Sequence, residues 1–175
     1  MKSSSLCFLS VFALSLLVHG CVAGVPLTTV SHVDLSRFSG TWYVIANIPT
    51  FIEKNAYNAV ESYRLADDGT IETVFTFRQG GFDGPIKTYG PRGFVRDTTT
   101  NAEWGMQFLW PFRSEYLITY LADDYSKTVI SRNKRDYVWI MARTPRISEA
   151  EYQELVAHVA AQGYDTSKLQ RVPQQ

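Results

Sequence analysis

The sequence predicts an all-β protein, an eight-stranded antiparallel up-and-down barrel with one C-terminal α-helix packed outside. Three observations predict this architecture. Eight runs rich in β-branched and aromatic residues follow one another without a helical pattern between them. Clusters of Gly, Asp, Asn and Pro separate the runs, as turns require. One amphipathic helical pattern with start and stop signals follows the last run.

The eight expected strands take up most of the chain. Their even spacing, with no helix between them, favours an antiparallel meander over βαβ units. Gly90 and Gly93, within the fourth run, are expected to mark bends where a barrel must curve. The runs cover residues 42–48, 57–65, 70–77, 87–96, 103–109, 116–121, 128–132 and 137–142.

The expected helix begins after Ser148 and ends before Gly163. Ser148 and Glu151 have the spacing of a capping box, and Ile147 is placed to form a hydrophobic staple with Tyr152. Apolar residues then recur every three or four positions, so one face of the helix must pack against the barrel. We expect this helix to have no chemical role. Its apolar stripe consists of Tyr152, Leu155, Val156 and Val159.

The N-terminus has the pattern of a secretory signal. Residues 1–20 combine a positive start with an apolar run over 6–18 that is too short for a membrane span. The run ends at Cys21 in a pattern similar to a bacterial lipobox, although His19 is atypical. We therefore expect Cys21 to carry lipid, residues 21–31 to form the lipidated N-terminus and tether, and residues 32–175 to form the domain. Cleavage near Gly20 or Ala23, with Cys21 incidental, is the alternative.

Composition excludes several classes of protein. Removing the signal would remove Lys2 from 17 basic residues and nothing from 17 acidic ones, which leaves a net charge of −1. No basic run offers a site for nucleic acid. Cys7 leaves with the signal, so the remaining Cys21 has no partner for an internal disulfide. About 155 residues make one domain whose core must stabilise it without disulfides.

Three short motifs fall at one end of the expected barrel. Gly40-Thr41-Trp42 opens the first strand, Asp123-Asp124-Tyr125 forms a turn, and Arg143 follows the last strand. Because antiparallel strands alternate in direction, these motifs meet at the same end. Their order and spacing resemble the signatures of the lipocalin family. The resemblance implies that Arg143 lies across Trp42 and closes this end in a structural role, through a cation–π contact of about 0.5–2 kcal/mol. The signature residues are Gly40, Trp42, Asp124, Tyr125 and Arg143.

A ligand would then enter through the opposite end, and alternation along the strands predicts the pocket lining. The face of Arg143 is shared by every second residue before it, and the apolar set of residues 104–110 points inward. For the second strand the family alignment favours the Tyr63 face, which would place Glu61 inside, in need of a partner or a proton. For the sixth strand we assign the face of Tyr116 and Ile118 to the interior of the barrel. The predicted lining is Tyr63, Met106, Phe108, Tyr116, Ile118, Tyr137, Trp139 and Met141.

The expected rim of the pocket is aromatic and cationic. Phe51, Trp110 and Phe112 lie on the turns at that end. Such a mouth suits an amphiphile with an anionic head group. The alternative is that the Lys and Arg residues on these turns only keep the protein soluble. The rim cations are Lys54, Arg113, Lys134 and Arg135.

The run from Trp139 to Pro145 and the opening of residues 40–43 are similar to the bacterial lipoprotein lipocalins, which also resemble the apolipoprotein D group. This resemblance implies binding of fatty acids or lysophospholipids for storage, transport or repair of envelope lipids, without a cofactor. It places the protein at the bacterial outer membrane, on the periplasmic side, and implies a homodimer for which the residues give no signal. Beyond the signal only His32 and His158 remain, so neither a catalytic triad nor a metal site is predicted. A binder of haem or another ring ligand, an enzyme, and a structural protein with a filled barrel are the alternatives.

Overall fold

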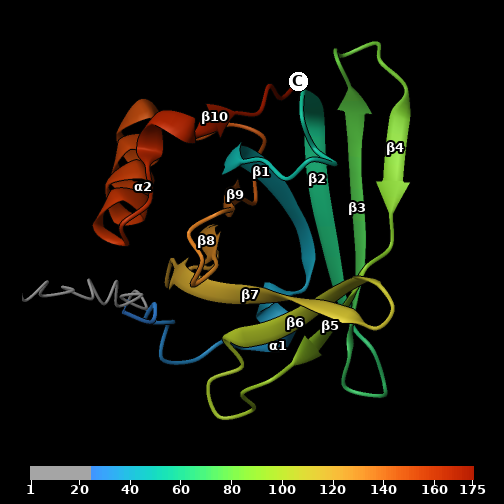
Figure 1. Ribbon diagram of the computed structural model, residues 1–175, viewed down its shortest axis with the longest axis vertical. Helices are drawn as coiled ribbons and strands as arrows, with labels where there is room; N and C mark the ends of the chain where they lie inside the picture. Colours follow the sequence, from blue (N-terminus) through green and yellow to red (C-terminus); the bar gives the residue numbers. More distant parts are fainter. Residues whose placement is uncertain (1–24) are drawn as a thin grey trace, which may run out of the picture.

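The computed structural model describes residues 25–175 (Figure 1). The expected signal segment and Cys21 lie outside the described residues. Residues 25–31 lie along the barrel, where Val30 donates a backbone hydrogen bond to the carbonyl of Ile118 at 3.0 Å. No helix within residues 25–175 is long and apolar enough to cross a membrane.

The strands form a closed antiparallel barrel, which confirms the predicted fold. Neighbouring strands follow the chain order, and β1 pairs with β9 to close the ring. A short β10 adds to the outer edge of β1. The strands are β1 Gly40–Ile48, β2 Ala56–Leu65, β3 Ile71–Gln79, β4 Ile86–Tyr89, β5 Arg92–Val95, β6 Glu103–Leu109, β7 Phe112–Leu121, β8 Lys127–Ser131, β9 Val138–Ala142 and β10 Gln170–Arg171.

Two strands differ from the expected ranges by more than a residue or two at their ends. The expected fourth strand is divided at Gly90-Pro91, because proline has no N–H to donate to a ladder. Its first half, β4, pairs with β3, and its second half, β5, pairs with β3 and β6. The second difference is β7, which begins at Phe112 rather than 116. The pairing of Leu109 with Phe112 makes β6 and β7 one long hairpin.

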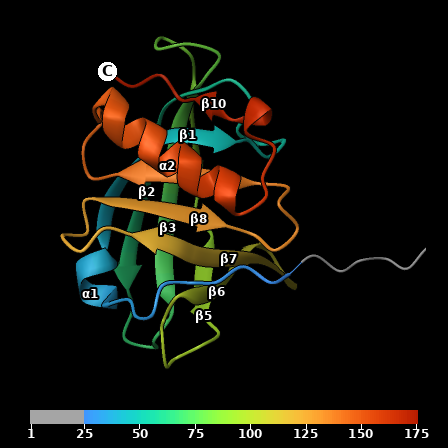
Figure 2. The same ribbon diagram turned by 90° about the vertical axis from the view of Figure 1, so that its left-hand side faces the viewer.

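The C-terminal helix α2 (Glu149–Ala161) has the predicted capping box between Ser148 and Glu151. It lies across the outer face of the barrel beside β1, β8 and β9 (Figure 2). Tyr152, Leu155 and Val159 are buried there. Two short helices were not predicted from the sequence, α1 Leu35–Phe38 and the 3-10 helix η1 Thr166–Lys168.

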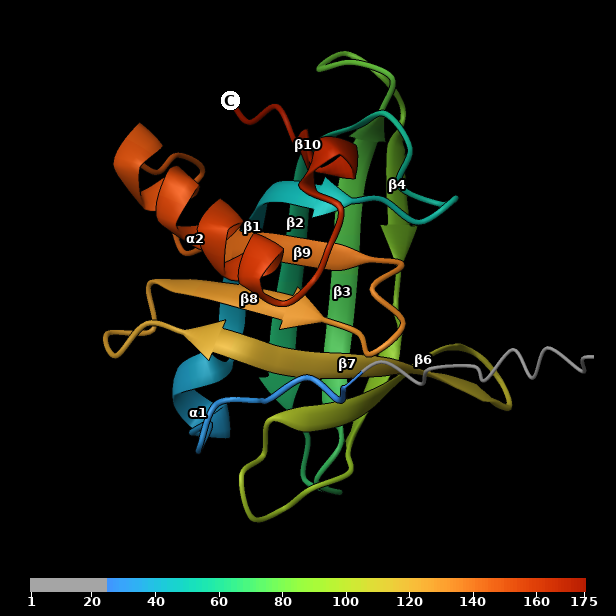
Figure 3. The same ribbon diagram turned by 60° about the vertical axis from the view of Figure 1, so that its left-hand side comes forward.

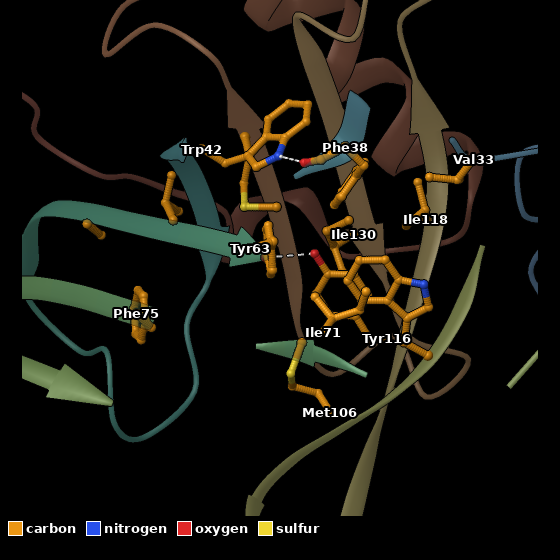
Figure 4. Packing of buried hydrophobic residues seen from close by; sticks show 14 of the residues in the cluster. Val33, Phe38, Trp42, Tyr63, Ile71, Phe75, Met106, Tyr116, Ile118 and Ile130 are labelled. Carbon is orange, nitrogen blue, oxygen red and sulfur yellow. Dashed lines mark hydrogen bonds between the residues drawn. The ribbon is translucent and has the colours of Figure 1, made fainter. Parts of the chain in front are cut away.

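The closed end of the barrel contains all five signature residues. The guanidinium of Arg143 lies 3.8 Å from the ring centroid of Trp42 and donates hydrogen bonds to the carbonyls of Thr41 at 2.9 Å and Phe38 at 3.0 Å. Trp42 is fully buried, and its indole N–H donates to the carbonyl of Phe38 at 2.9 Å (Figure 4). A Cβ on Gly40 would lie 3.3 Å from Arg143 Nη1, and Gly40 has a φ of +98°, so both space and backbone favour glycine.

The turn motif supports the same end. The hydroxyl of Tyr125 accepts a hydrogen bond from the backbone N–H of Asp34 at 2.9 Å, and its ring lies under the guanidinium of Arg37 at 3.9 Å. Asp124 accepts from the N–H of Ser126 at 2.9 Å and thereby fixes the turn. These contacts hold α1 against the barrel, so that α1 closes this end.

Candidate functional site

The open half of the barrel contains a cavity of about 430 Å³. This volume lies within the range of small-molecule sites, which is about 300–1,000 Å³. Eleven of its seventeen lining residues are apolar or aromatic. The part of the barrel toward the closed end is filled by packed side chains, among them Phe38, Trp42, Ile118 and Ile130 (Figure 4). The barrel is therefore half core and half pocket.

Five of the eight predicted pocket residues line this cavity. Tyr63, Ile118 and Met141 do not line it. They belong instead to the packed core toward the closed end and are at most 3% exposed. Alternation assigned these three side chains to the inside of the barrel, but it carries no information about depth along the axis. The five lining residues are Met106, Phe108, Tyr116, Tyr137 and Trp139.

Glu61 lies at the deep end of the cavity, as its face of β2 predicted. Tyr63 donates its hydroxyl hydrogen bond to the Glu61 carboxyl group, and the hydroxyls of Tyr63 and Tyr116 are 2.8 Å apart. Burial raises the pKa of Glu61 to about 7, because an apolar pocket disfavours the charged form. The deep end therefore holds a carboxyl group that is neutral below this pH and can gain a charge above it.

Glu53 is a second carboxyl group in the lining, and the sequence analysis missed it. It is only 4% exposed, although it lies in the loop between β1 and β2. Its oxygens accept hydrogen bonds from Trp139 Nε1 at 2.9 Å, Asn47 Nδ2 at 2.8 Å and Thr50 Oγ1 at 2.9 Å. Burial raises its pKa, and these donors oppose the rise. Glu53 thus fixes the indole of Trp139 against the cavity.

None of the four predicted rim cations lines the cavity. Lys54 and Lys134 are exposed, and Arg113 stacks on the ring of Phe94 with 3.4 Å to the centroid. Arg135 donates to the backbone carbonyls of Val25 at 2.7 Å and Gln162 at 3.1 Å, so its guanidinium holds the chain rather than a ligand.

Arg132 is the cation that the structure places in the lining. Its Nη1 lies 3.4 Å from the carboxylate of Asp136, and its side chain is 15% exposed. Its guanidinium carbon lies 5.2 Å from the ring centroid of Tyr137. Among the described residues its Nε finds no hydrogen-bond partner. A buried donor without a partner is costly, so an anionic group in the cavity would satisfy it.

The lining contains no histidine or cysteine. Within residues 25–175 no group of three or more His, Cys, Asp or Glu residues could hold a metal ion. The chemistry that the cavity offers is therefore apolar contact, one guanidinium and the carboxyl groups of Glu53, Glu61 and Glu115.

The family model of the lipocalin-like domain matches residues 33–174. The chain belongs to the lipocalin family. This lipocalin is 31% identical to outer membrane lipoprotein Blc of Citrobacter freundii over 156 residues, which cover 87% of this chain and 88% of that protein. It is 30% identical to temperature-induced lipocalin-1 of Arabidopsis thaliana over 160 residues, which cover 85% and 83% of the two chains.

A solved structure shows the same fold as this lipocalin. Insecticyanin from the tobacco hornworm Manduca sexta superposes with a TM-score of 0.65, covering 83% of each chain at 16% identity. Membership of the lipocalin family supports a protein that binds a hydrophobic ligand.

Proposed function

We propose that this lipocalin holds an acyl lipid, either a fatty acid or a lysophospholipid, in the open half of its barrel. The observation that carries the proposal is the cavity of about 430 Å³, closed at one end and lined mainly by apolar side chains. An acyl chain would lie along Phe75, Met106 and Tyr116, because flexible thioether and aromatic surfaces suit a chain without fixed shape. The roles proposed are storage, transport or repair of envelope lipids.

We also propose that the protein is anchored at the outer membrane, on the periplasmic side, through lipid on Cys21. The lipobox-like pattern at Cys21 supports this, and the similar bacterial proteins are named outer membrane lipoproteins. A single acyl chain anchors a protein only marginally, so the proposal includes more than one chain on this residue.

The indole of Trp139 provides the test of lipid binding, because it lines the cavity and is fixed by Glu53. Titration with oleate or lysophosphatidylcholine should change tryptophan fluorescence in a saturable way. Trp139→Phe should remove most of this change while the other three tryptophans remain. If lipids leave the fluorescence unchanged while haem quenches it and binds, the ring-ligand alternative takes the place of the proposal.

Arg132 should select anionic head groups. Arg132→Gln should weaken oleate binding about tenfold, since hydrogen bonds to charged groups contribute about 1.5–3 kcal/mol. Binding of a neutral monoacylglycerol should change little. Lys134→Gln is the matched control, because Lys134 lies on the same turn but does not line the cavity. Equal losses in the two variants would show that general positive charge, and not Arg132, attracts the ligand.

Glu61 should make binding depend on pH. Its pKa of about 7 lies above the ordinary 4.5, so the neutral form is favoured below pH 7 and lost above it. An acyl chain that excludes water from this carboxyl group prefers the neutral form, so affinity falls as pH rises. Between pH 6 and pH 8 the affinity for lysophosphatidylcholine, whose charge is constant in this range, should fall about tenfold. Glu61→Gln should bind equally at both pH values, and an unchanged pH profile in this variant would exclude Glu61 as the cause.

A further inference from the structure

Exposed apolar side chains gather on two of the loops at the mouth of the cavity. Exposed hydrophobic residues that stand alone are ordinary, whereas a contiguous patch indicates a partner. Of the nine large hydrophobic side chains that the described residues expose, five lie on the β1–β2 loop and the β6–β7 hairpin. We call these five residues the apolar rim. They are Phe51 at 80% exposure, Phe108 at 51%, Leu109 at 71%, Trp110 at 81% and Phe112 at 72%.

The apolar rim is continuous with the cavity, because Phe51, Phe108 and Leu109 line it. The β6–β7 hairpin projects past the neighbouring strands (Figure 3), and Trp110 and Phe112 lie at its tip. In Figures 2 and 3 the β6–β7 hairpin, the β8–β9 turn and the beginning of the described chain lie toward the same side of the molecule. A flat surface on that side would therefore meet the mouth of the barrel.

Exposed cations flank the apolar rim. Lys54 lies on the β1–β2 loop, Arg113 follows Phe112, and Lys134 lies on the β8–β9 turn. The carboxylates of the same loops have partners within the protein. Glu53 accepts from Trp139, Glu115 accepts from Asn133 at 2.7 Å, and Asp136 pairs with Arg132. The exposed charge of these three loops is therefore mainly positive.

The described chain also begins at this end. Arg135 on the β8–β9 turn holds the carbonyl of Val25, and Asn133 accepts the N–H of Leu27 at 2.7 Å. Four peptide units connect Val25 to Cys21, and even fully extended they span at most about 14 Å. A lipid on Cys21 would therefore keep the mouth of the barrel close to the membrane.

We propose that the open end of the barrel docks on a lipid bilayer, with the apolar rim in the interface and the flanking cations on anionic head groups. Tryptophan and phenylalanine suit the interface between hydrocarbon and water, and nearby Lys and Arg are attracted to anionic lipids. The cavity then opens onto the bilayer, and an acyl ligand passes between them without crossing water. A second copy of the chain fits less well, because a symmetric contact between two rims would bring like charges together.

This proposal rests on the proposed lipid binding and anchoring, so its test removes the anchor and measures the two activities apart. The mature chain, residues 21–175 with Cys21→Ser and without the signal segment, should float with vesicles of phosphatidylcholine and phosphatidylglycerol, and less with phosphatidylcholine alone. Trp110→Ser/Phe112→Ser in this background should reduce the vesicle-bound fraction at least about fivefold. Neither residue lines the cavity, so the affinity for lysophosphatidylcholine below its micellar concentration should stay the same. The matched control is Val74→Ser/Ile86→Ser, which removes exposed apolar residues outside the apolar rim and should leave flotation unchanged.

Salt should weaken the preference for anionic vesicles, because exposed charges are screened. The proposal is overturned if the Cys21→Ser chain does not float with either vesicle, or if the rim variant floats as well as its parent. It is also overturned if the rim variant changes a dimer into a monomer in sedimentation while flotation is unaffected. Loss of lysophosphatidylcholine binding by the parent chain would instead count against the proposed function.

Discussion

Replacing Trp42 with alanine should lower the free energy of unfolding by about 3–5 kcal/mol. The side chain is fully buried, and its ring centroid lies 5.0 Å from that of Phe38. The guanidinium of Arg143 lies over the same indole ring. The substitution leaves a cavity and removes the indole N–H from the carbonyl of Phe38. Urea denaturation followed by circular dichroism measures the loss.

Trp110→Ala is the matched control for this prediction, because it makes the same chemical change at a side chain that is 81% exposed. Its free energy of unfolding should change by less than about 0.5 kcal/mol. The account of the closed end would be wrong if Trp42→Ala cost less than about 1 kcal/mol. If Trp42→Ala kept its stability but lost lipid binding, Trp42 would be a ligand-binding residue and not a structural one.

Met106→Asp should reduce affinity for acyl lipids at least about a hundredfold. Met106 is 5% exposed and lines the cavity, so the new carboxylate would lose its water where the ligand chain packs. Fluorescence titration at pH 8 measures the effect, with the melting temperature recorded to verify folding.

Two comparison variants separate charge from shape at this site. Met106→Leu keeps the volume and the apolar surface of this side chain and should bind within about threefold of the parent. Phe108→Asp places the same charge at the mouth, where the side chain is 51% exposed, and should weaken binding far less. If all three variants bind lipid equally, the ligand does not occupy this cavity.

The fold could be predicted from the sequence because its signals are local. Turn residues separate the strands, the capping box marks α2, and the five signature residues meet at the end where an antiparallel meander must bring them. The break between β4 and β5 was not predicted: a bend was expected at Gly90, whereas Pro91, which cannot donate to a ladder, divides the strand there. The start of β7 was hidden because Arg113, Ser114 and Glu115 give that stretch no apolar alternation.

The site was less predictable because it depends on contacts between distant parts of the chain. Alternation identified which side chains point inward but could not separate Met106, which lines the cavity, from Met141, which lies in the core. Glu53 is buried beside Trp139, 86 residues away, and accepts its indole N–H. Arg132 lines the cavity. The sequence analysis assigned the rim charge instead to Lys134 and Arg135 on the turn that follows it.

Native mass spectrometry of the Cys21→Ser chain, purified from a bacterial envelope without added lipid, tests lipid binding most directly. If this lipocalin holds an acyl lipid, we expect one adduct per chain with the mass of a fatty acid or lysophospholipid. Met106→Asp should lose this adduct and Met106→Leu should keep it. A chain without any adduct that also takes up no lipid when it is added, or a chain that carries a haem-sized adduct, would contradict the proposal.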